Sequence, residues 1–280
     1  MKKYRMTEES IEFEGHKLFR IEATKDIGKI KTGTSGGFVE TEDNLSQEGD
    51  CWVGGDAKVY GKARVSGDAL VADQAIVCDS AHVAEEAKVV GNAKIADYAR
   101  ISGKARVGRF ATVSGAALIT ENAYIMDNAT VSGYAHVGDF ARVFDYGKVN
   151  GKAMLFNYAW VYGDACITEN AKVYNNAKIF DHACVTGRAR VFDNARVFGA
   201  ADIIDDAMVF GHSWIYDNAV VSKSAQIFDC ARVFEKATVS DKSKVFDYAK
   251  IHGNAKVLAE SRVFYKQNIS SGKLQKRAPR

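Results

Sequence analysis

The amino-acid sequence predicts an all-β protein whose chain winds into a triangular parallel solenoid, and three regularities support this prediction. Every sixth residue from Val53 to Val263 is Val or Ile, with Leu155 the one variant, which makes 36 consecutive positions. Two residues before these positions, from 57 to 261, Ala occupies 31 of 35 places. Two residues after them, Gly, Asp, Asn or Glu occupies 32 of 36. A constant interval over this length indicates a repeat architecture.

Each six-residue repeat predicts one short strand followed by a corner. Residues two apart point to the same face of a strand, so the Ala and the Val or Ile face inward. Gly and Asp tolerate the backbone conformations of tight turns, so the third position forms the corner. Three equal sides close a coil of 18 residues, and 36 repeats make about 12 coils. The inward Val and Ile residues then stack coil upon coil as the core.

Residues 1–50 lie outside the repeat and predict a small N-terminal β capping module. The segment SIEFEGHKLFRIEA alternates apolar and polar residues on both sides of Glu14 and Gly15, which is typical of a hairpin. Because an uncovered strand edge promotes aggregation, we expect the module to cover the first coil. The repeat is assigned to residues 51–264. Residues 265–280 predict a basic C-terminal tail, so we expect another subunit or a partner to cover the last coil.

Composition argues against several classes of protein. The chain has 38 basic and 35 acidic residues, and the excess lies in the tail, which does not suit a general nucleic-acid or membrane binder. No apolar run approaches the roughly 18 to 20 residues of a membrane span, and the basic start lacks the apolar middle of a signal peptide. A cytoplasmic location is therefore predicted.

The five cysteines form no CxxC pair and are odd in number, so neither a metal site nor a closed disulfide framework is predicted. Cys166 and Cys184 are 18 residues apart and should lie on neighbouring coils. In a reducing compartment we expect free thiols, although the two are close enough to bond if oxidised. Whether they pair is left open.

The repeat unit A-x-V-x-(G/D)-x, as in AKVYGK, ARVFDN and AKIFDH, resembles the hexapeptide repeat of left-handed parallel β-helix proteins. The stretch GHKLFRIEATKDIGKIKTGTSGGFVETEDNLSQEGDCWV resembles the N-terminal module of an uncharacterised bacterial and phage group, the YdcK-like proteins, which are labelled as transferases. The resemblance implies the left hand of the coil, which the spacing alone does not. The transferase label itself rests on the repeat and implies little chemistry.

The residue just after each inward Val or Ile is aromatic on two sides of the later coils and mostly small or polar in the coils before residue 140. We predict that these aromatic residues bind a protein partner or mediate self-association into a dimer or a higher homo-oligomer. The alternative is that the rings only stiffen the solenoid by stacking. The two sets are Phe144, Tyr162, Phe180, Phe198, Tyr216 and Phe234 on one side, and Phe156, Tyr174, Phe192, Phe210, Phe228, Phe246 and Phe264 on the other.

Basic and aromatic residues alternate beside the first set, at the position before each inward residue. This pattern suits an acidic protein surface or a single-stranded nucleic acid. Corner acids such as Asp181 and Asp229 and the near-neutral charge of the repeat make nucleic acid the less favoured partner. Solvated cations on an outer surface are the simpler interpretation. The candidate binding residues are Arg142, Trp160, Lys178, Arg196, Trp214 and Arg232.

An acyl-CoA-dependent O- or N-acyltransferase is the alternative function, because many hexapeptide-repeat proteins transfer acyl groups with a His as general base. Acetyl-CoA would then be the cofactor; otherwise none is predicted. The uninterrupted repeat leaves no loop to enclose an acceptor, and His136 and His82, the two candidate bases, are three coils apart. We therefore expect a non-catalytic scaffold that docks a protein partner, such as a phage or mobile-element factor acting on a host complex.

Overall fold

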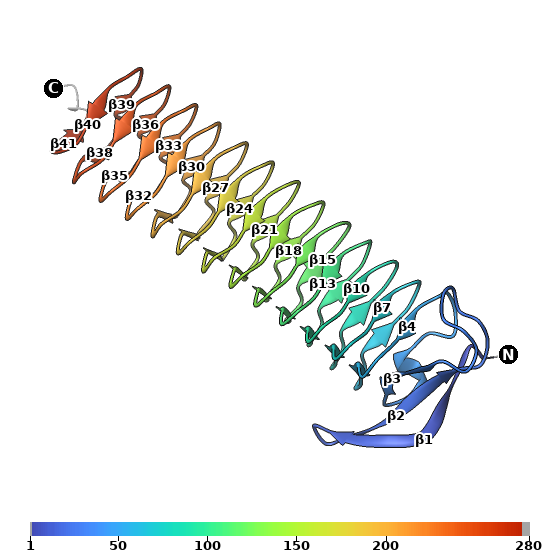
Figure 1. Ribbon diagram of the computed structural model, residues 1–280. Coiled ribbons are helices and arrows are strands. Elements are labelled where there is room, and N and C mark those ends of the chain that lie inside the picture. The colour runs from blue at the N-terminus through green and yellow to red at the C-terminus, as the bar shows by residue number, and fades with distance from the viewer. Residues whose placement is uncertain (1, 276–280) are drawn as a thin grey trace. The chain divides into compact units, whose positions relative to one another are not determined.

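A computed structural model describes residues 2–275 of the chain. The chain forms two compact units, residues 1–139 and residues 140–280, which we call the N-terminal unit and the C-terminal unit. Within each unit, short strands recur every six residues and pair in parallel with the strand 18 residues further on, as Lys88 does with Arg106 and Lys172 with Arg190 (Figure 1). The predicted all-β parallel solenoid of 18-residue coils is therefore confirmed.

The coils of the N-terminal unit have three sides, and the strands of each side form one parallel sheet. The first side consists of β4 (Trp52–Val53), β7 (Leu70–Val71), β10 (Lys88–Val89), β13 (Arg106–Val107) and β16 (Tyr124–Ile125). The second consists of β5 (Lys58–Val59), β8 (Ile76–Val77), β11 (Lys94–Ile95), β14 (Thr112–Val113) and β17 (Thr130–Val131). The third consists of β6 (Arg64–Val65), β9 (His82–Val83), β12 (Arg100–Ile101), β15 (Leu118–Ile119) and β18 (His136–Val137).

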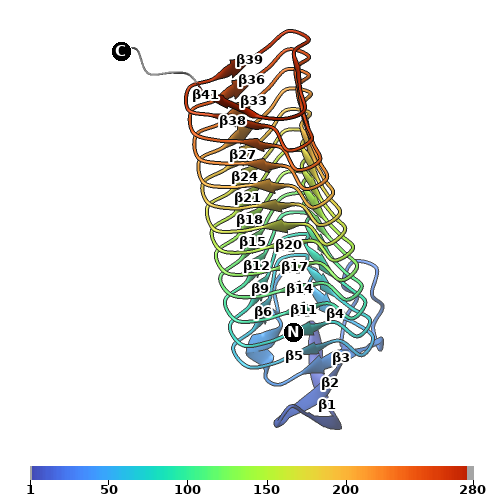
Figure 2. The same cartoon turned by 90° about the vertical axis from the view of Figure 1, so that its left-hand side faces the viewer.

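The C-terminal unit has the same three sides, whose strands lie above one another in successive coils (Figure 2). Its first side consists of β19 (Arg142–Val143), β22 (Trp160–Val161), β25 (Lys178–Ile179), β28 (Arg196–Val197), β31 (Trp214–Ile215), β34 (Arg232–Val233), β37 (Lys250–Ile251) and β40 (Asn268–Ile269). The second consists of β20 (Lys148–Val149), β23 (Cys166–Ile167), β26 (Cys184–Val185), β29 (Asp202–Ile203), β32 (Val220–Val221), β35 (Thr238–Val239), β38 (Lys256–Leu258) and β41 (Lys273–Gln275). The third consists of β21 (Met154–Leu155), β24 (Lys172–Val173), β27 (Arg190–Val191), β30 (Met208–Val209), β33 (Gln226–Ile227), β36 (Lys244–Val245) and β39 (Arg262–Val263).

The core consists of the inward Ala and Val or Ile residues, as the repeat predicts. Ala177 and Ile179, for example, are fully buried, and the same holds along both units. Ser213 takes an inward Ala position, where its buried hydroxyl donates to the carbonyl oxygen of Phe210 at 2.8 Å. This bond satisfies the one polar group that the substitution adds to the core.

Every predicted corner residue, from position 55 to 265, has a positive φ, such as 57° at Asp181 and 67° at Gly199. Gly adopts this left-handed conformation without strain, and Asp and Asn adopt it more readily than other residues. The acidic corners have a second role, because their carboxylates accept the backbone N–H of the corner one coil further on. Gly199 N donates to Asp181 at 3.1 Å, and Gly211 N donates to Asp193 at 3.2 Å.

The N-terminal module forms the predicted hairpin between β1 (Tyr4–Phe13) and β2 (His16–Ala23), which turns at Glu14 and Gly15 with positive φ at both. Strand β3 (Ser35–Val39) pairs antiparallel with β2 and parallel with β5. The hairpin also packs over the second side of the unit, where Leu18 contacts a cluster containing Phe38, Tyr60, Cys78 and Ala96. The module therefore covers both an edge and an outer face of the first coils.

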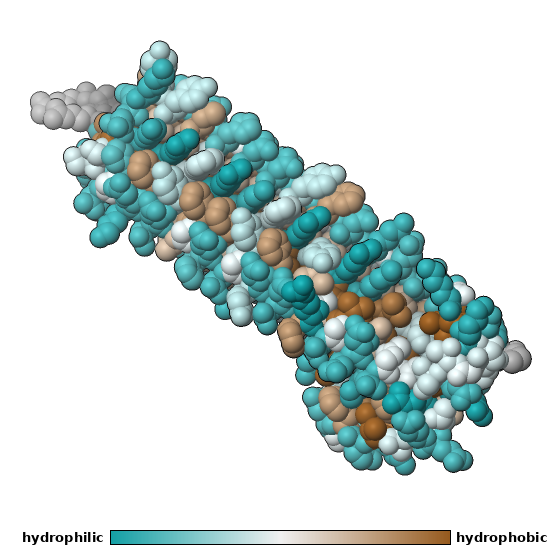
Figure 3. All heavy atoms as spheres, viewed as in Figure 1, coloured by the Kyte–Doolittle hydropathy of each residue, from teal (hydrophilic) through white to brown (hydrophobic). Residues whose placement is uncertain are grey.

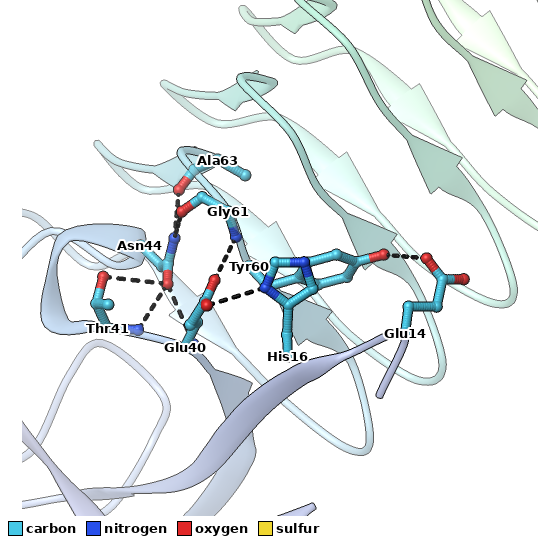
Figure 4. A network of polar contacts seen from close by, with 8 residues as sticks. All are labelled: Glu14, His16, Glu40, Thr41, Asn44, Tyr60, Gly61 and Ala63. Atoms are coloured by element: carbon cyan, nitrogen blue, oxygen red, sulfur yellow. Dashed lines mark hydrogen bonds and ion pairs between the residues drawn. The ribbon is translucent and has the colours of Figure 1, made fainter. Parts of the chain in front are cut away.

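Polar side chains of the module satisfy backbone groups at the start of the solenoid (Figure 4). At the end of the short 3-10 helix η1 (Glu42–Asn44), the Asn44 side chain donates to the carbonyl oxygen of Ala63 at 2.8 Å. Glu40 accepts the Gly61 N–H at 2.7 Å and pairs with His16 Nδ1 at 2.9 Å. An open edge strand would leave these groups to bond with another chain, so the module protects the end.

At the other end, the solenoid continues beyond Phe264, the residue at which the repeat is predicted to end. Strand β40 pairs with β37, and β41 pairs with β38. The physical reason is that Ile269 keeps the six-residue spacing after Val263, although no Ala precedes it. Of the predicted basic tail, residues 276–280 lie outside the described part. Coverage of the last coil by a second subunit or a partner stays a prediction.

Candidate functional site

Six predicted aromatic residues form a continuous stack on the first side of the C-terminal unit. Neighbouring rings have centroids 4.8–4.9 Å apart and planes within 5° of parallel, because the strand spacing places one ring above the next. His252 extends the stack at 4.9 Å from Phe234. The members of this first-side ladder are Phe144, Tyr162, Phe180, Phe198, Tyr216, Phe234 and His252.

A second stack occupies the equivalent positions of the third side of the same unit. From Tyr174 to Phe246 the ring centroids are 4.8–5.0 Å apart, and Phe264 ends the stack at 5.5 Å from Phe246. The rings are half-buried, except that Phe264 is 47% exposed. In both ladders the faces of neighbouring rings cover one another. Stacking is therefore established for these predicted site residues, and binding of a partner stays a prediction.

The basic and aromatic column beside the first-side ladder forms two cation–π groups. Arg142 and Lys178 lie 5.3 and 4.3 Å from the Trp160 ring centroid. Arg196 and Arg232 lie 5.3 and 4.7 Å from the centroid of Trp214. Each indole thus takes one cation from the coil before it and one from the coil after it, an attraction between positive charge and ring quadrupole.

The two tryptophans join the column to the ladder. Trp160 meets Phe144 edge to face at 6.0 Å, and Trp214 meets Phe198 in the same way at 6.3 Å. We call the combined surface the cation–aromatic face. It consists of the first-side ladder with Arg142, Trp160, Lys178, Arg196, Trp214, Arg232 and Lys250.

The charge of the cation–aromatic face is one-sided. None of its outward positions on β19 to β37 holds a carboxylate, and within the described residues Arg196, Arg232 and Lys250 form no ion pair with an acid. Acidic corners of the same unit use their carboxylates to accept backbone N–H groups, as Asp217 accepts that of Glu235. Arg196, Arg232 and Lys250 therefore give the outward positions of β28, β34 and β37 a positive charge.

A shallow groove of about 510 Å³ lies along one border of this face. Arg196, Trp214 and Arg232 form part of its wall. The remaining lining residues are Asn194, His212, Cys230, Tyr248 and Lys250. On the side of the molecule drawn in Figure 3, hydrophobic residues gather over β4 and β7, whereas hydrophilic and paler residues alternate along the C-terminal unit.

The two candidate catalytic histidines lie apart on the third side of the N-terminal unit. His82 Nε2 is 2.9 Å from Ser66 Oγ, and His136 Nε2 is 3.0 Å from Thr120 Oγ1. Burial lowers the pKa of both imidazoles, and the charges of Arg64 and Arg100 add to this effect at His82. Each pair places an imidazole beside a hydroxyl, as nucleophile activation requires. Neither His lines the grooves beside Arg196, Phe156 or Arg262 in the described part of the C-terminal unit.

Other grooves line different parts of the C-terminal unit. One of about 390 Å³ lies on the third side beside Phe156, Tyr174 and Arg190, and one of about 690 Å³ lies at the last coils beside Arg262 and Leu274. In the described part of the chain, no group of three or more His, Cys, Asp or Glu residues is arranged to hold a metal ion.

Two kinds of contact were not predicted from the sequence: rings at the position after a corner, and the contact of His82 with Ser66. Tyr158 and Tyr248, which follow a corner directly, are more exposed than the ladder rings, at 55% and 63%. Tyr158 stacks on Phe140 at 5.1 Å. Sorting the position after each corner by coil would have found them. The His82 and Ser66 contact joins residues 16 apart, an offset that is visible only once the coils are stacked.

The fold defines a parallel β-helix repeat protein. No protein-family model matches the sequence, and no curated protein matches it. Within the described residues, no helix has the length and apolar character to cross a membrane.

Proposed function

We propose that the protein is a non-catalytic scaffold that docks an acidic segment of a partner protein on the cation–aromatic face. The observation that favours this function most is the positive strip without carboxylates on β19 to β37. Arginine and aromatic side chains dominate the energetics of many protein interfaces, and guanidinium groups bind carboxylates in a defined geometry. Kinship with YdcK-like hexapeptide-repeat proteins and a cytoplasmic location are parts of this proposal, supported by the sequence pattern alone.

The packing of the rings favours a protein partner over a single-stranded nucleic acid. Bases bind such surfaces by stacking on free aromatic faces. Here Trp160 and Trp214 have cations over their rings, and the ladder rings cover one another. A nucleic acid would have to displace these contacts, whereas a carboxylate needs only the outward ends of the arginines and lysines.

The test uses a fluorescent Glu-rich peptide and the full chain in an anisotropy titration at low and moderate salt. The face variant Arg196→Gln, Arg232→Gln, Lys250→Gln should weaken peptide binding by about tenfold or more, since each lost charge contact is a sizeable fraction of a weak interface. The matched control, Lys172→Gln, Arg190→Gln, Lys244→Gln, removes three cations from the third side of the same unit and should change binding by about twofold or less.

Three outcomes contradict the proposal. Equal losses in the two variants would mean that net charge alone attracts the peptide. Tighter binding of an oligothymidylate than of the peptide would indicate a nucleic-acid surface. A stable dimer in sedimentation of the protein alone, abolished by the face variant, would indicate that the face joins two copies of the chain.

A further inference from the structure

Two cysteines lie side by side on the second side of the C-terminal unit, away from the cation–aromatic face. Cys166 on β23 and Cys184 on β26 are register partners on adjacent parallel strands. Both precede an inward residue, so both side chains point outward, and both are half-exposed free thiols. The backbone ladder holds them in place, because Cys166 N donates to Ala183 and Cys184 N donates to Ala201.

The neighbours of this pair make the two thiols unequal. Lys148 on β20 is the register partner of Cys166 on its other side, and Asp202 on β29 is that of Cys184. The column therefore reads cation, thiol, thiol, carboxylate. A nearby cation stabilises a thiolate and a nearby carboxylate opposes it. A hydrogen bond from Cys184 and the charge of Lys148 lower the pKa of Cys166, against the opposing effect of burial, and the pKa of Cys184 is raised.

We propose that Cys166 and Cys184 form a redox-active dithiol site, in which Cys166 reacts with a hydroperoxide and Cys184 resolves the product. The Cys166 thiolate attacks one peroxide oxygen, the O–O bond breaks, and the leaving alkoxide or hydroxide takes a proton from solvent. Cys166 becomes a sulfenic acid. The Cys184 sulfur then attacks Cys166 Sγ, the S–O bond breaks, and water leaves with the Cys184 proton. The pair loses two electrons to the peroxide and ends as a disulfide.

The register of the strands permits this disulfide without a change of fold. Adjacent parallel strands are about 4.8 Å apart, and disulfides join Cα atoms that are about 4.4–6.8 Å apart. Thr168 and Thr186, two positions further along the same strands, already bond to each other through their hydroxyls at 2.8 Å. Only the two cysteine side chains therefore have to rotate.

The first experiment adds one equivalent of hydrogen peroxide to the reduced full chain and reads the intact mass and the peptide map. We expect the loss of two hydrogen atoms and a peptide pair joined through Cys166 and Cys184. In Cys184→Ser the reaction should stop at a sulfenic acid on Cys166, which a cyclic 1,3-diketone traps. In Cys166→Ser neither product should form.

Cys230, a single half-exposed thiol of the same unit, is the internal control. At neutral pH, iodoacetamide should alkylate Cys166 about fivefold or more faster than Cys230, and Lys148→Met should reduce that ratio by about half or more. Equal rates for the two cysteines, trapped sulfenic acid on Cys230 as often as on Cys166, or oxidation that yields only chain-to-chain disulfides would each overturn the proposal. Peptide binding by the cation–aromatic face is independent of all these results.

Discussion

The N-terminal and C-terminal units share a core and differ on the surface. Both bury the same Ala and Val or Ile ladders, and both turn at corners with positive φ. The difference lies at the outward position that directly follows each inward residue of the third side. There the N-terminal unit has Ala84, Ser102 and Thr120, whereas the C-terminal unit has stacked rings such as Phe192 and Phe210. Because inward and outward positions alternate along each strand, the surface changes without disturbing the core.

The outer faces also differ in what covers them. In the N-terminal unit the β1–β2 hairpin packs on the second side, so Tyr60 and Cys78 are outward residues that are nonetheless buried, at 4% and 3% exposure. In the C-terminal unit the aromatic rings cover one another instead, and the cation–aromatic face remains at the surface. An outer face of this fold can therefore bind its own chain, stack on itself or be left for a partner.

The largest expected effect tests the buried core that the two units share. Ile101 in the N-terminal unit and Ile227 in the C-terminal unit are both inward, fully buried residues of the third side. Replacing either by Ala should cost about 2 to 5 kcal/mol, because each leaves a cavity in the same kind of core. Hydrogen exchange of the amides in the same and adjacent coils measures the loss locally, which suits a solenoid whose coils contact only their neighbours. A large cost in one unit and none in the other would mean that the cores are not equivalent.

A smaller effect tests the outward residues of the third side, which differ between the two units. Phe210→Ala breaks two stacked contacts, with Phe192 and with Phe228, and should lower local stability by about 1 to 3 kcal/mol. Ser102 is the residue at the same position of the third side in the N-terminal unit. Ser102→Ala should stay within about 0.5 kcal/mol, as most surface substitutions do. If the Phe210 variant lost no protection in adjacent coils, the ladder would not stabilise the solenoid, and an interface would be its main role.

The smallest effect concerns the N-terminal module and depends on pH. The hydrogen bond from His16, together with the Gly61 N–H and against the effect of burial, lowers the pKa of Glu40 below its ordinary 4.5. The ionised carboxylate therefore adds stability above about pH 4.5, and this contribution is lost as the pH falls through the lowered value. Glu40→Gln should lower the melting temperature at pH 7 and reduce the further loss between pH 5 and pH 3.

Glu12→Gln is the matched control, because among the described residues the Glu12 carboxylate, on the same hairpin, makes no hydrogen bond or ion pair with the first coil. The melting temperature of the Glu12→Gln variant should match that of the unaltered protein between pH 7 and pH 3. Identical pH curves for Glu40→Gln and the unaltered protein would show that the His16 and Glu40 contact does not contribute to folding.

Much of the fold was predictable because a strict period assigns an environment to each position. Val53 to Val263 face inward, the residues two positions later form corners, and Glu14 with Gly15 turns the hairpin, all as the sequence predicts. The predicted end of the repeat was too early. Ile269 retains the spacing, but the Ala and the Gly or Asp that mark a repeat are missing around it, so the pattern indicated an end at Phe264.

The candidate site was predictable as a list of outward residues and not as a set of contacts. Sorting by coil placed Arg196, Trp214 and Arg232 in one column, as the strand pairing shows. It left open whether the indole faces were free or occupied, a difference on which the proposed choice of partner rests. The occupancy of the indole faces depends on side-chain rotamers in adjacent coils, about which the period carries no information.

The amino-acid sequence by itself therefore determined the length of the repeat, the corners, the inward core and which residues share a side. These properties are local, since each follows from alternation within a six-residue repeat and from the few residue types that accept a positive φ. The tertiary structure alone decided the contacts between residues 16 or 18 apart. These include His82 with Ser66, the corner carboxylates with the next backbone N–H, the cations over each indole and the asymmetric neighbours of the thiol pair. Such contacts depend on the spacing and register of stacked coils, which no single repeat contains.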